Sequence, residues 1–315
     1  MRRTRNWLVR AGLVVLLWGS PVWLALAGIQ EQSDEESAQP PLPPRVVGQA
    51  ASQQELDDFR AVERTFSVDD KIELAKTFLK TYPNSGLSAH AHRVLALGHY
   101  QNDDVVEFVH HGEKALEELP GDAALLAILA WFYSENEQPE KAIDRAQRAL
   151  HFIDLSQRPG FVSVSEWAER TDRLKADAHY AQGRAYMEKF DSSGVKKATE
   201  EDPHLQASAE HLRQAVILVP DFGQAYHRLG YIYLKQQQTE PAIASYARAI
   251  AAPGPATQPA RLDLETVFVR LGKSPDTIDK MVSREAKHIE EKNAEKADLR
   301  QKLEAEAAPP SPIVQ

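Results

Sequence analysis

The feature that most constrains this sequence is a spacing of 34 residues that recurs through its middle. Three units begin at Ala89, Ala123 and Gly223, and each has Leu at its seventh position, Ala or Gly at its eighth and Ala at its 27th. Repeats of this length are two-helix units that bury their apolar faces on one another. Small side chains at fixed positions allow the two helices of a hairpin to touch. Bulky residues between these positions fill the remaining space. The spacing therefore predicts stacked helical hairpins.

A fourth unit of the same kind is interrupted. Its first helix carries Gly183 at the eighth position, but Ala215, at the 27th, comes thirteen residues too late. We therefore expect a long loop at about 189–204 between its two helices. A second insertion, 157–175, precedes the unit, and Ser163-Val164-Ser165-Glu166 within it is typical of a helix N-cap. Insertions in a repeat array map to one face and often carry its special contacts.

This pattern resembles the tetratricopeptide repeat (TPR) family. The resemblance covers Glu55–Ala256 and implies an all-α solenoid of about four hairpins with a capping C-terminal helix. The expected repeats are 89–122, 123–156, 176–222 with the insertion, and 223–256. Residues 52–88 are expected to form a degenerate first repeat or N-terminal cap, and Lys80–Ser85 are similar to the loop after the second helix in bacterial envelope TPR proteins.

The segment after the repeats begins with a break at Pro253-Gly254-Pro255. Residues 257–307 are expected to form capping and charged helices, because the terminal unit of a repeat array needs a cover for its apolar face. One helix ends before Gly272, a residue typical of a C-cap. Beyond Glu290 apolar residues thin out among alternating charges, which is typical of a solvated helix, and 308–315 should be a disordered tail.

The first 27 residues are expected to lie outside the fold. Four arginines precede an apolar run, 11–27, and Ala25-Leu26-Ala27 matches a signal-peptidase site. The alternative is an uncleaved membrane anchor, since the run approaches the ~20 residues that span a bilayer. Either interpretation predicts a periplasmic or secreted protein, with the folded part outside the cytoplasm. Residues 28–51 are acidic and then proline-rich, which indicates a disordered linker.

Composition excludes several classes of function. The chain of 315 residues has no cysteine, so disulfide scaffolds, thiolate zinc sites and cysteine nucleophiles are absent. Its formal net charge of −9 argues against a nucleic-acid partner, which would need a basic face. We found no nucleotide-binding loop, no serine-hydrolase elbow and no zinc-protease helix in the sequence. We therefore expect no enzyme activity, no catalytic residues and no cofactor.

Histidine is the one ligand-grade residue that clusters. Five of the eleven histidines fall within a short stretch: His90, His92, His99, His110 and His111. Such a group binds zinc or nickel if its rings converge, because neutral imidazole is a common metal ligand. However, His90 and His92 are two residues apart on an expected helix and point in different directions. We therefore expect packing histidines and no metal site.

The resemblance also implies where a partner would bind. In the family, positions 2, 5, 9, 12 and 13 of each first helix line a concave groove. Position 5 is Arg93, Ala127, Tyr180 and His227, and position 9 is Leu97, Trp131, Arg184 and Tyr231. We therefore expect a partner-binding groove formed by Arg93, Trp131, Tyr180, Arg184, His227 and Tyr231. Aromatic rings mixed with arginine suit an extended peptide or helix. The alternative is that Trp131 and Tyr231 only pack against neighbouring hairpins.

Together these features predict an exported TPR scaffold or adaptor that binds a protein or peptide partner. The alternative is an accessory or substrate-binding subunit of an envelope enzyme system. That subunit would use the insertions at 157–175 and 189–204 around the first helix of the interrupted repeat. A continuous open groove favours the scaffold, and an apolar cavity between the insertions favours the accessory subunit.

Overall fold

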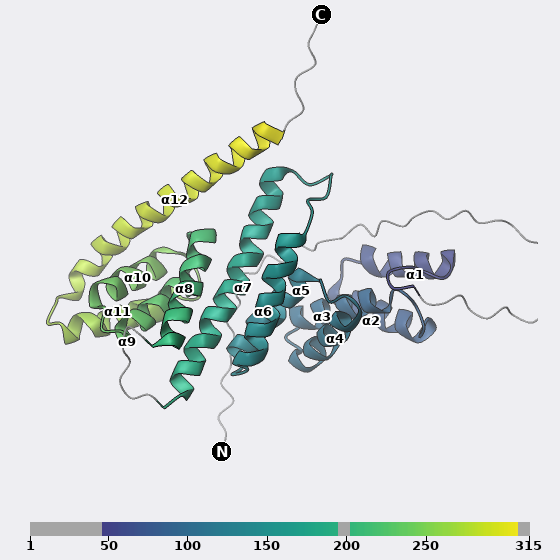
Figure 1. Ribbon diagram of the computed structural model, residues 1–315, viewed down its shortest axis with the longest axis horizontal. Helices are drawn as coiled ribbons and strands as arrows, with labels where there is room; N and C mark the ends of the chain where they lie inside the picture. Colours follow the sequence, from purple (N-terminus) through teal and green to yellow (C-terminus); the bar gives the residue numbers. More distant parts are fainter. Residues whose placement is uncertain (1–45, 195–201, 308–315) are drawn as a thin grey trace, which may run out of the picture. The chain divides into compact units, whose positions relative to one another are not determined.

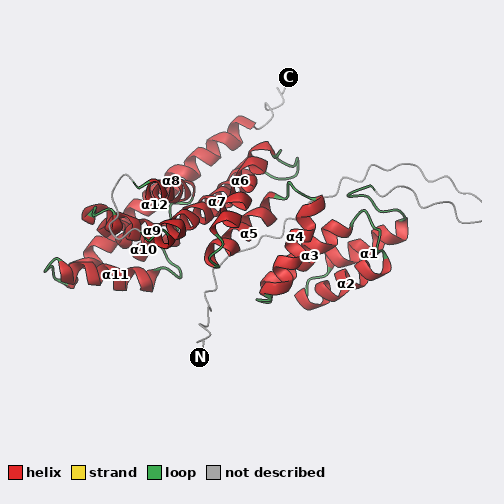
Figure 2. Ribbon diagram, turned by 60° about the horizontal axis from the view of Figure 1, so that its bottom comes forward, coloured by secondary structure: helices red, strands yellow, loops and turns green. Residues whose placement is uncertain are grey.

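A computed structural model describes residues 46–194 and 202–307. The predicted signal or anchor (1–27), most of the predicted linker (28–51), part of the loop between the helices of the interrupted repeat (195–201) and the predicted tail (308–315) lie outside the described residues. Within the described ranges every regular element is a helix (Figures 1 and 2). The predicted all-α class is confirmed.

The helices follow one another as hairpins. They are α1 (Gln53–Arg64), α2 (Val68–Thr81), α3 (Ser88–Gln101), α4 (Val105–Glu118), α5 (Ala123–Glu135), α6 (Pro139–Leu155), α7 (Val164–Ser192), α8 (Pro203–Leu218), α9 (Gly223–Lys235), α10 (Thr239–Ala251), α11 (Thr257–Arg270), the short 3-10 helix η1 (Pro275–Thr277) and α12 (Ile278–Ala307). The chain forms two compact units that divide at Leu125 and Leu126, near the start of α5, and each is described separately below.

The first unit, within 46–125, packs α1 on α2, α2 on α3 and α3 on α4. Phe59 and Phe78 meet edge to face, with ring centroids 5.3 Å apart, at the centre of its core. The helix starts carry capping side chains. The Asp104 carboxylate accepts from the backbone of α4, and the Ser67 hydroxyl caps α2, whose first turn carries Asp69 and Asp70.

The second unit, within 126–307, packs each helix from α6 to α11 on the next. Its core is continuous from Tyr180 on α7 to Phe268 on α11. Two glycines at the eighth repeat position permit the close helix contacts. A Cβ added at Gly183 would lie 2.6 Å from the Leu212 side chain, and one at Gly230 would lie 2.7 Å from the Tyr246 ring.

The insertion before the interrupted repeat lengthens its first helix. The Ser163 hydroxyl accepts from the backbone N–H of Glu166 and caps α7, so the predicted N-cap is confirmed. The helix has 29 residues, more than four turns longer than the first helices α5 and α9, with 13 each.

The C-terminal elements cover the last repeat. The helix α11 packs on α10, and Gly272 follows it with a φ of 66°, as expected of a C-cap glycine. The first turns of α12 bury Ile278 and Ile289 and pack on α10. The predicted capping role is confirmed.

The outer half of α12 is not simply a solvated helix, as its alternating charges suggested. It runs beside the N-terminal part of α7 and contacts that helix through charged groups (Figure 1). Lys296 Nζ lies 2.8 Å from Asp172 Oδ2, and Arg300 reaches both Asp172 and Glu169. Glu304 accepts from the backbone N–H of Ser165 in the first turn of α7. The insertion before the interrupted repeat is therefore held by the C-terminal helix.

We predict that Gly230→Ala lowers the free energy of unfolding by about 1–2 kcal/mol. A methyl group there would overlap the buried Tyr246 ring, and overpacking typically costs about 1–3 kcal/mol, which exceeds the helix propensity that alanine adds. Urea denaturation checks this. The control Gln224→Ala, at a half-exposed position of the same helix, should change stability by less than about 0.5 kcal/mol. An equal loss in both variants would contradict the contact.

Candidate functional site

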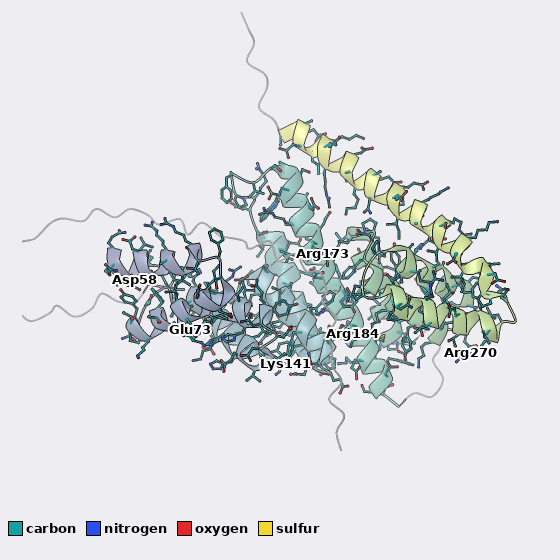
Figure 3. All side chains as sticks on the ribbon, turned by 180° about the vertical axis from the view of Figure 1, so that it is seen from behind. Asp58, Glu73, Lys141, Arg173, Arg184 and Arg270 are labelled. Atoms are coloured by element: carbon teal, nitrogen blue, oxygen red, sulfur yellow. The ribbon has the colours of Figure 1, made fainter. Side chains whose placement is uncertain are left out.

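Five of the six residues predicted to bind a partner lie in the second unit, on the first helices of successive hairpins. Trp131 is on α5, Tyr180 and Arg184 are on α7, and His227 and Tyr231 are on α9. We call the surface of α5, α7 and α9 that carries these five residues the helix-A face. Figure 3 labels two of its basic side chains, Arg173 and Arg184, along α7.

The centre of the helix-A face is a group of three stacked aromatic rings. The Trp131 and Tyr180 centroids are 4.3 Å apart with the planes inclined by 26°. Phe222, immediately before α9, lies 5.2 Å from Tyr180 and 5.9 Å from Trp131. Tyr180 is 1% exposed, whereas Trp131 is half-buried. The rings of three helices are therefore brought together, and Trp131 takes part in the packing between hairpins that was the alternative interpretation.

An ion pair between the half-exposed Arg173 and the buried Asp177 adjoins the aromatic group. The guanidinium of Arg173 lies over the Phe222 ring, 5.0 Å from its centroid. Arg173 Nε donates to Asp177 Oδ2 at 3.4 Å and lies 3.2 Å from Oδ1, which accepts no hydrogen bond. Burial raises the pKa of Asp177 to about 6, although Arg173 acts in the opposite direction. This carboxylate is therefore held in its charged form at a free-energy cost.

A charged network lies on the other side of Tyr180. The Tyr180 hydroxyl donates to Glu135 Oε1 at 3.3 Å, and Arg184 Nε lies 3.0 Å from the same oxygen. Arg184 also donates to the backbone oxygen of Ser134, at the end of α5. Arg228, mostly buried on α9, is hydrogen-bonded to the Tyr180 hydroxyl. Burial raises the pKa of Tyr180, so this hydroxyl stays protonated at neutral pH.

The remaining two residues of the face pair with carboxylates of neighbouring helices, Asp191 near the end of α7 and Asp263 in the middle of α11. The Tyr231 hydroxyl donates to Asp191 at 2.9 Å, and Lys235 Nζ lies 4.9 Å from the Tyr231 ring centroid. His227 Nε2 lies 2.8 Å from Asp263 Oδ2 on α11. Burial lowers the pKa of His227 more than the bond to Asp263 raises it.

Arg93 lies in the first unit and makes none of these contacts. It pairs with Asp122, whose carboxylate also accepts from the backbone N–H of Leu125 at 3.0 Å. The structure therefore gives Arg93 a role in the turn that follows α4.

Sequence reasoning identified the helices and positions of the face but missed several of its side chains. Phe222 precedes its helix, so no repeat position marks it, and Arg228 lies at position 6, outside the groove pattern. Position 2 of the interrupted repeat is Asp177, so the family pattern could have indicated it. Each predicted residue has a partner within its own unit, and its binding of another molecule stays a prediction.

The histidines of the predicted cluster separate. His90 packs on Phe59, His92, His99 and His111 gather between α3 and α4, and His110 is exposed on α4 beside His111. No set of three or more histidine or acidic residues with metal-binding geometry occurs in ranges 46–194 and 202–307. In those same ranges, no helix is both long enough and apolar enough to cross a membrane.

Comparison with known proteins adds three findings. The sequence matches no curated protein. A family model described as the Est1 DNA/RNA binding domain matches residues 208–304, which is less than half of the chain. Solved structures with similar helices include MamA (20% identity, 67% of this chain and 96% of that chain, TM-score 0.42), the type IV pilus biogenesis factor PilW (13%, 69% and 94%, 0.42) and Acl4, an assembly chaperone of RpL4 (16%, 79% and 99%, 0.49). The paired helices and their small-residue positions give this chain a TPR-like fold.

We predict that Asp177→Asn stabilises the protein at pH 8 by about 1–3 kcal/mol. The raised pKa means that the charged form destabilises the fold, and each pKa unit corresponds to about 1.4 kcal/mol. The gain should be fully present above pH 6, decline as pH falls from 6 to 4, and disappear below about pH 4, where Asp177 becomes protonated in the unfolded state as well. Denaturant midpoints at several pH values measure it.

The exposed Asp154→Asn is the matched control for this prediction. Its ion pair with Lys175 lies at the surface, so the change should be within about 0.5 kcal/mol at every pH. A gain at Asp177 that did not depend on pH would indicate improved packing and contradict the role of its charge.

Proposed function

We propose that this protein is an exported scaffold or adaptor that binds a protein or peptide partner with its helix-A face. The observation that carries the proposal is the concentration of aromatic and arginine side chains on α5, α7 and α9. The half-buried Trp131 stacks there on the buried rings of Tyr180 and Phe222, flanked by Arg173 and Arg184. Tryptophan, tyrosine and arginine are the residues most enriched among those that dominate binding energy.

The charged groups of the face support a protein partner over a small apolar ligand. Asp191 accepts from Tyr231, and Asp263 from His227, at exposed or half-exposed sites on the rim of the aromatic group. Protein–protein interfaces commonly have an aromatic-rich centre and a polar, solvent-accessible rim. We therefore favour a non-catalytic binding role.

The accessory-subunit alternative is less well supported. It needs the insertion at 157–175 to be available as a lid. The described part of this insertion is instead engaged by α12, through Lys296 and Arg300 on Asp172. The chain thus uses this segment as an internal contact.

Nucleic acid is a second candidate partner because of the family match at 208–304. Basic side chains there pair with carboxylates within the chain, as Arg248 does with Glu285 and Arg261 with Asp279. Phosphate contacts would have to displace these pairs, so we favour a protein. Titration of the protein with labelled DNA and RNA at low salt distinguishes a nucleic-acid partner from a protein partner. Salt-sensitive binding that is lost in Arg261→Ala would favour nucleic acid.

We predict that Tyr231→Ala weakens partner binding at least tenfold while the protein stays folded. A photo-crosslinking amino acid at position 231 should capture the partner in cell-envelope extracts, and one at Arg213, exposed on α8, should not. Affinity for the captured partner is then measured with Tyr231→Ala and with the control Arg213→Ala. An interfacial aromatic anchor typically contributes about 2 kcal/mol or more. Equal affinity in the two variants would move the binding surface away from the helix-A face.

The proposed export has its own test. N-terminal sequencing of the mature protein should start at Gly28 if the signal is cleaved. A start at Met1 in the membrane fraction would identify 11–27 as an anchor. Full-length protein in the soluble cytoplasm would contradict both forms of the proposal.

A further inference from the structure

The hairpin α3–α4 contains three imidazole rings in a row. His92 on α3 and His111 on α4 meet with their Nδ1 atoms 2.9 Å apart. His99 on α3 stacks on His111. The centroids of these two rings are 5.8 Å apart and their planes are inclined by 22°. His99 is held in turn by Asp104 at the start of α4, 3.1 Å from its Nδ1.

The hairpin α7–α8 repeats this arrangement at the same repeat positions. His179 and His211 have their Nδ1 atoms 3.1 Å apart, and the Tyr186 ring lies parallel to that of His211 at 5.7 Å. In both hairpins the rings come from positions 4, 23 and 11 of the repeat. The hairpins α5–α6 and α9–α10 have no histidine at these positions: Leu126 and Tyr226 occupy position 4, and Arg145 and Ser245 occupy position 23.

A bond between two Nδ1 atoms holds one proton. One imidazole donates its Nδ1–H, and the other must present a bare Nδ1, which only the neutral ring has. A first added proton can go to the free Nε2 of the donor ring and leave the bond in place. A second proton must add to the acceptor Nδ1, so that an N–H faces an N–H and two charges lie together between the helices. The bond is therefore compatible with neutral histidines and not with a fully protonated pair.

From this geometry we infer that acid weakens the contact between the two helices of each histidine-bonded hairpin. We call these two helix contacts, α3–α4 and α7–α8, the acid-sensitive joints. Protonation of both imidazoles of a pair breaks the Nδ1–Nδ1 bond and opens α3–α4 and α7–α8 locally, whereas α5–α6, which has no such pair, stays closed.

The surroundings of each pair favour the neutral form. Burial lowers the pKa of His111 and of His179 to about 4, and it lowers those of His92 and His211 as well. The groups that face the first pair are Lys114, His110 and Glu118 on α4 and His99 on α3, and Glu107 lies 3.5 Å from His111 Nε2. Those that face the second are Lys175 on α7, Asp154 on α6 and Glu210 on α8.

The direction of the pH effect follows from these shifts. A histidine with a folded pKa below its unfolded value of 6.5 takes up its proton on opening. Closure is therefore favoured above pH 6.5 and weakens as pH falls toward 4. Asp177 on α7 has a raised pKa and acts in the opposite direction over part of this range, so the pairs must be followed locally.

The second joint adjoins the helix-A face. His179 directly precedes Tyr180, whose ring is the centre of the aromatic group. If the proposed function holds, acid will therefore weaken the grip of that face on its partner. This effect on partner binding rests on the proposed function, whereas the acid response of the two hairpins does not.

Hydrogen exchange of the full-length protein without a partner tests the joints. Between pH 7 and pH 5, and after correction for intrinsic exchange, we expect protection in α3–α4 and α7–α8 to fall about tenfold or more. A pKa lowered by about two units raises the opening constant by up to about a hundredfold once the histidine has titrated in the open state. Protection in α5–α6 should change less than about threefold. An equal fall in all hairpins, or none in the two with histidine pairs, would overturn the inference.

Two variants assign the effect to the paired nitrogens. In His111→Asn and His211→Asn the amide oxygen can accept from a neutral or a charged imidazole, so each should lose most of the acid response in its own hairpin. His110→Asn, exposed beside the first pair, should keep the full response. An unchanged response in the first two variants would contradict the inference.

A titration of the wild-type imidazole resonances covers the case of a variant that does not fold. Paired histidines should titrate below about pH 5.5, and ordinary values near 6.5 for both members of a pair would also overturn the inference.

Discussion

The close contact of two helices through a residue without a side chain is the constraint on which the second unit depends. Gly183 lies against Leu212, and Gly230 lies against the Tyr246 ring, with no room for a methyl group at either place. This contact fixes how the two helices of a hairpin cross. Tyr180 and Arg184 on α7, and His227 and Tyr231 on α9, are carried by the first helices of these hairpins.

Sequence reasoning succeeded where the signal is a short, fixed spacing. The eighth and 27th positions gave the hairpins, and the Ser163–Glu166 pair gave the start of α7, because capping and helix contact both depend on local spacing. Partners across helices could not be predicted in the same way. Asp191 binds Tyr231 and Glu135 binds Arg184 over 40 residues or more, and many other carboxylates were available to each.

The C-terminal helix illustrates the same limit. Alternating charges after Glu290 are compatible with a helix in solvent and equally with one that pairs with another helix. The structure pairs Lys296 and Arg300 with Asp172, in the part of α7 that the insertion adds. An inserted segment and a terminal helix thus stabilise each other, although neither has a repeat position from which the contact could be inferred.

The helix α7 combines features that a purely structural helix would not need. A buried carboxylate is costly even beside a cation, yet α7 holds the buried Asp177 next to the half-exposed Arg173. Two residues further it carries His179 in a bond that needs a neutral ring. Acid stabilises the fold through the carboxyl group, because its pKa is raised, and destabilises it through the histidines, because theirs are lowered. The two effects oppose each other within one helix, so a flat dependence of overall stability on pH is compatible with large local changes at the helix-A face.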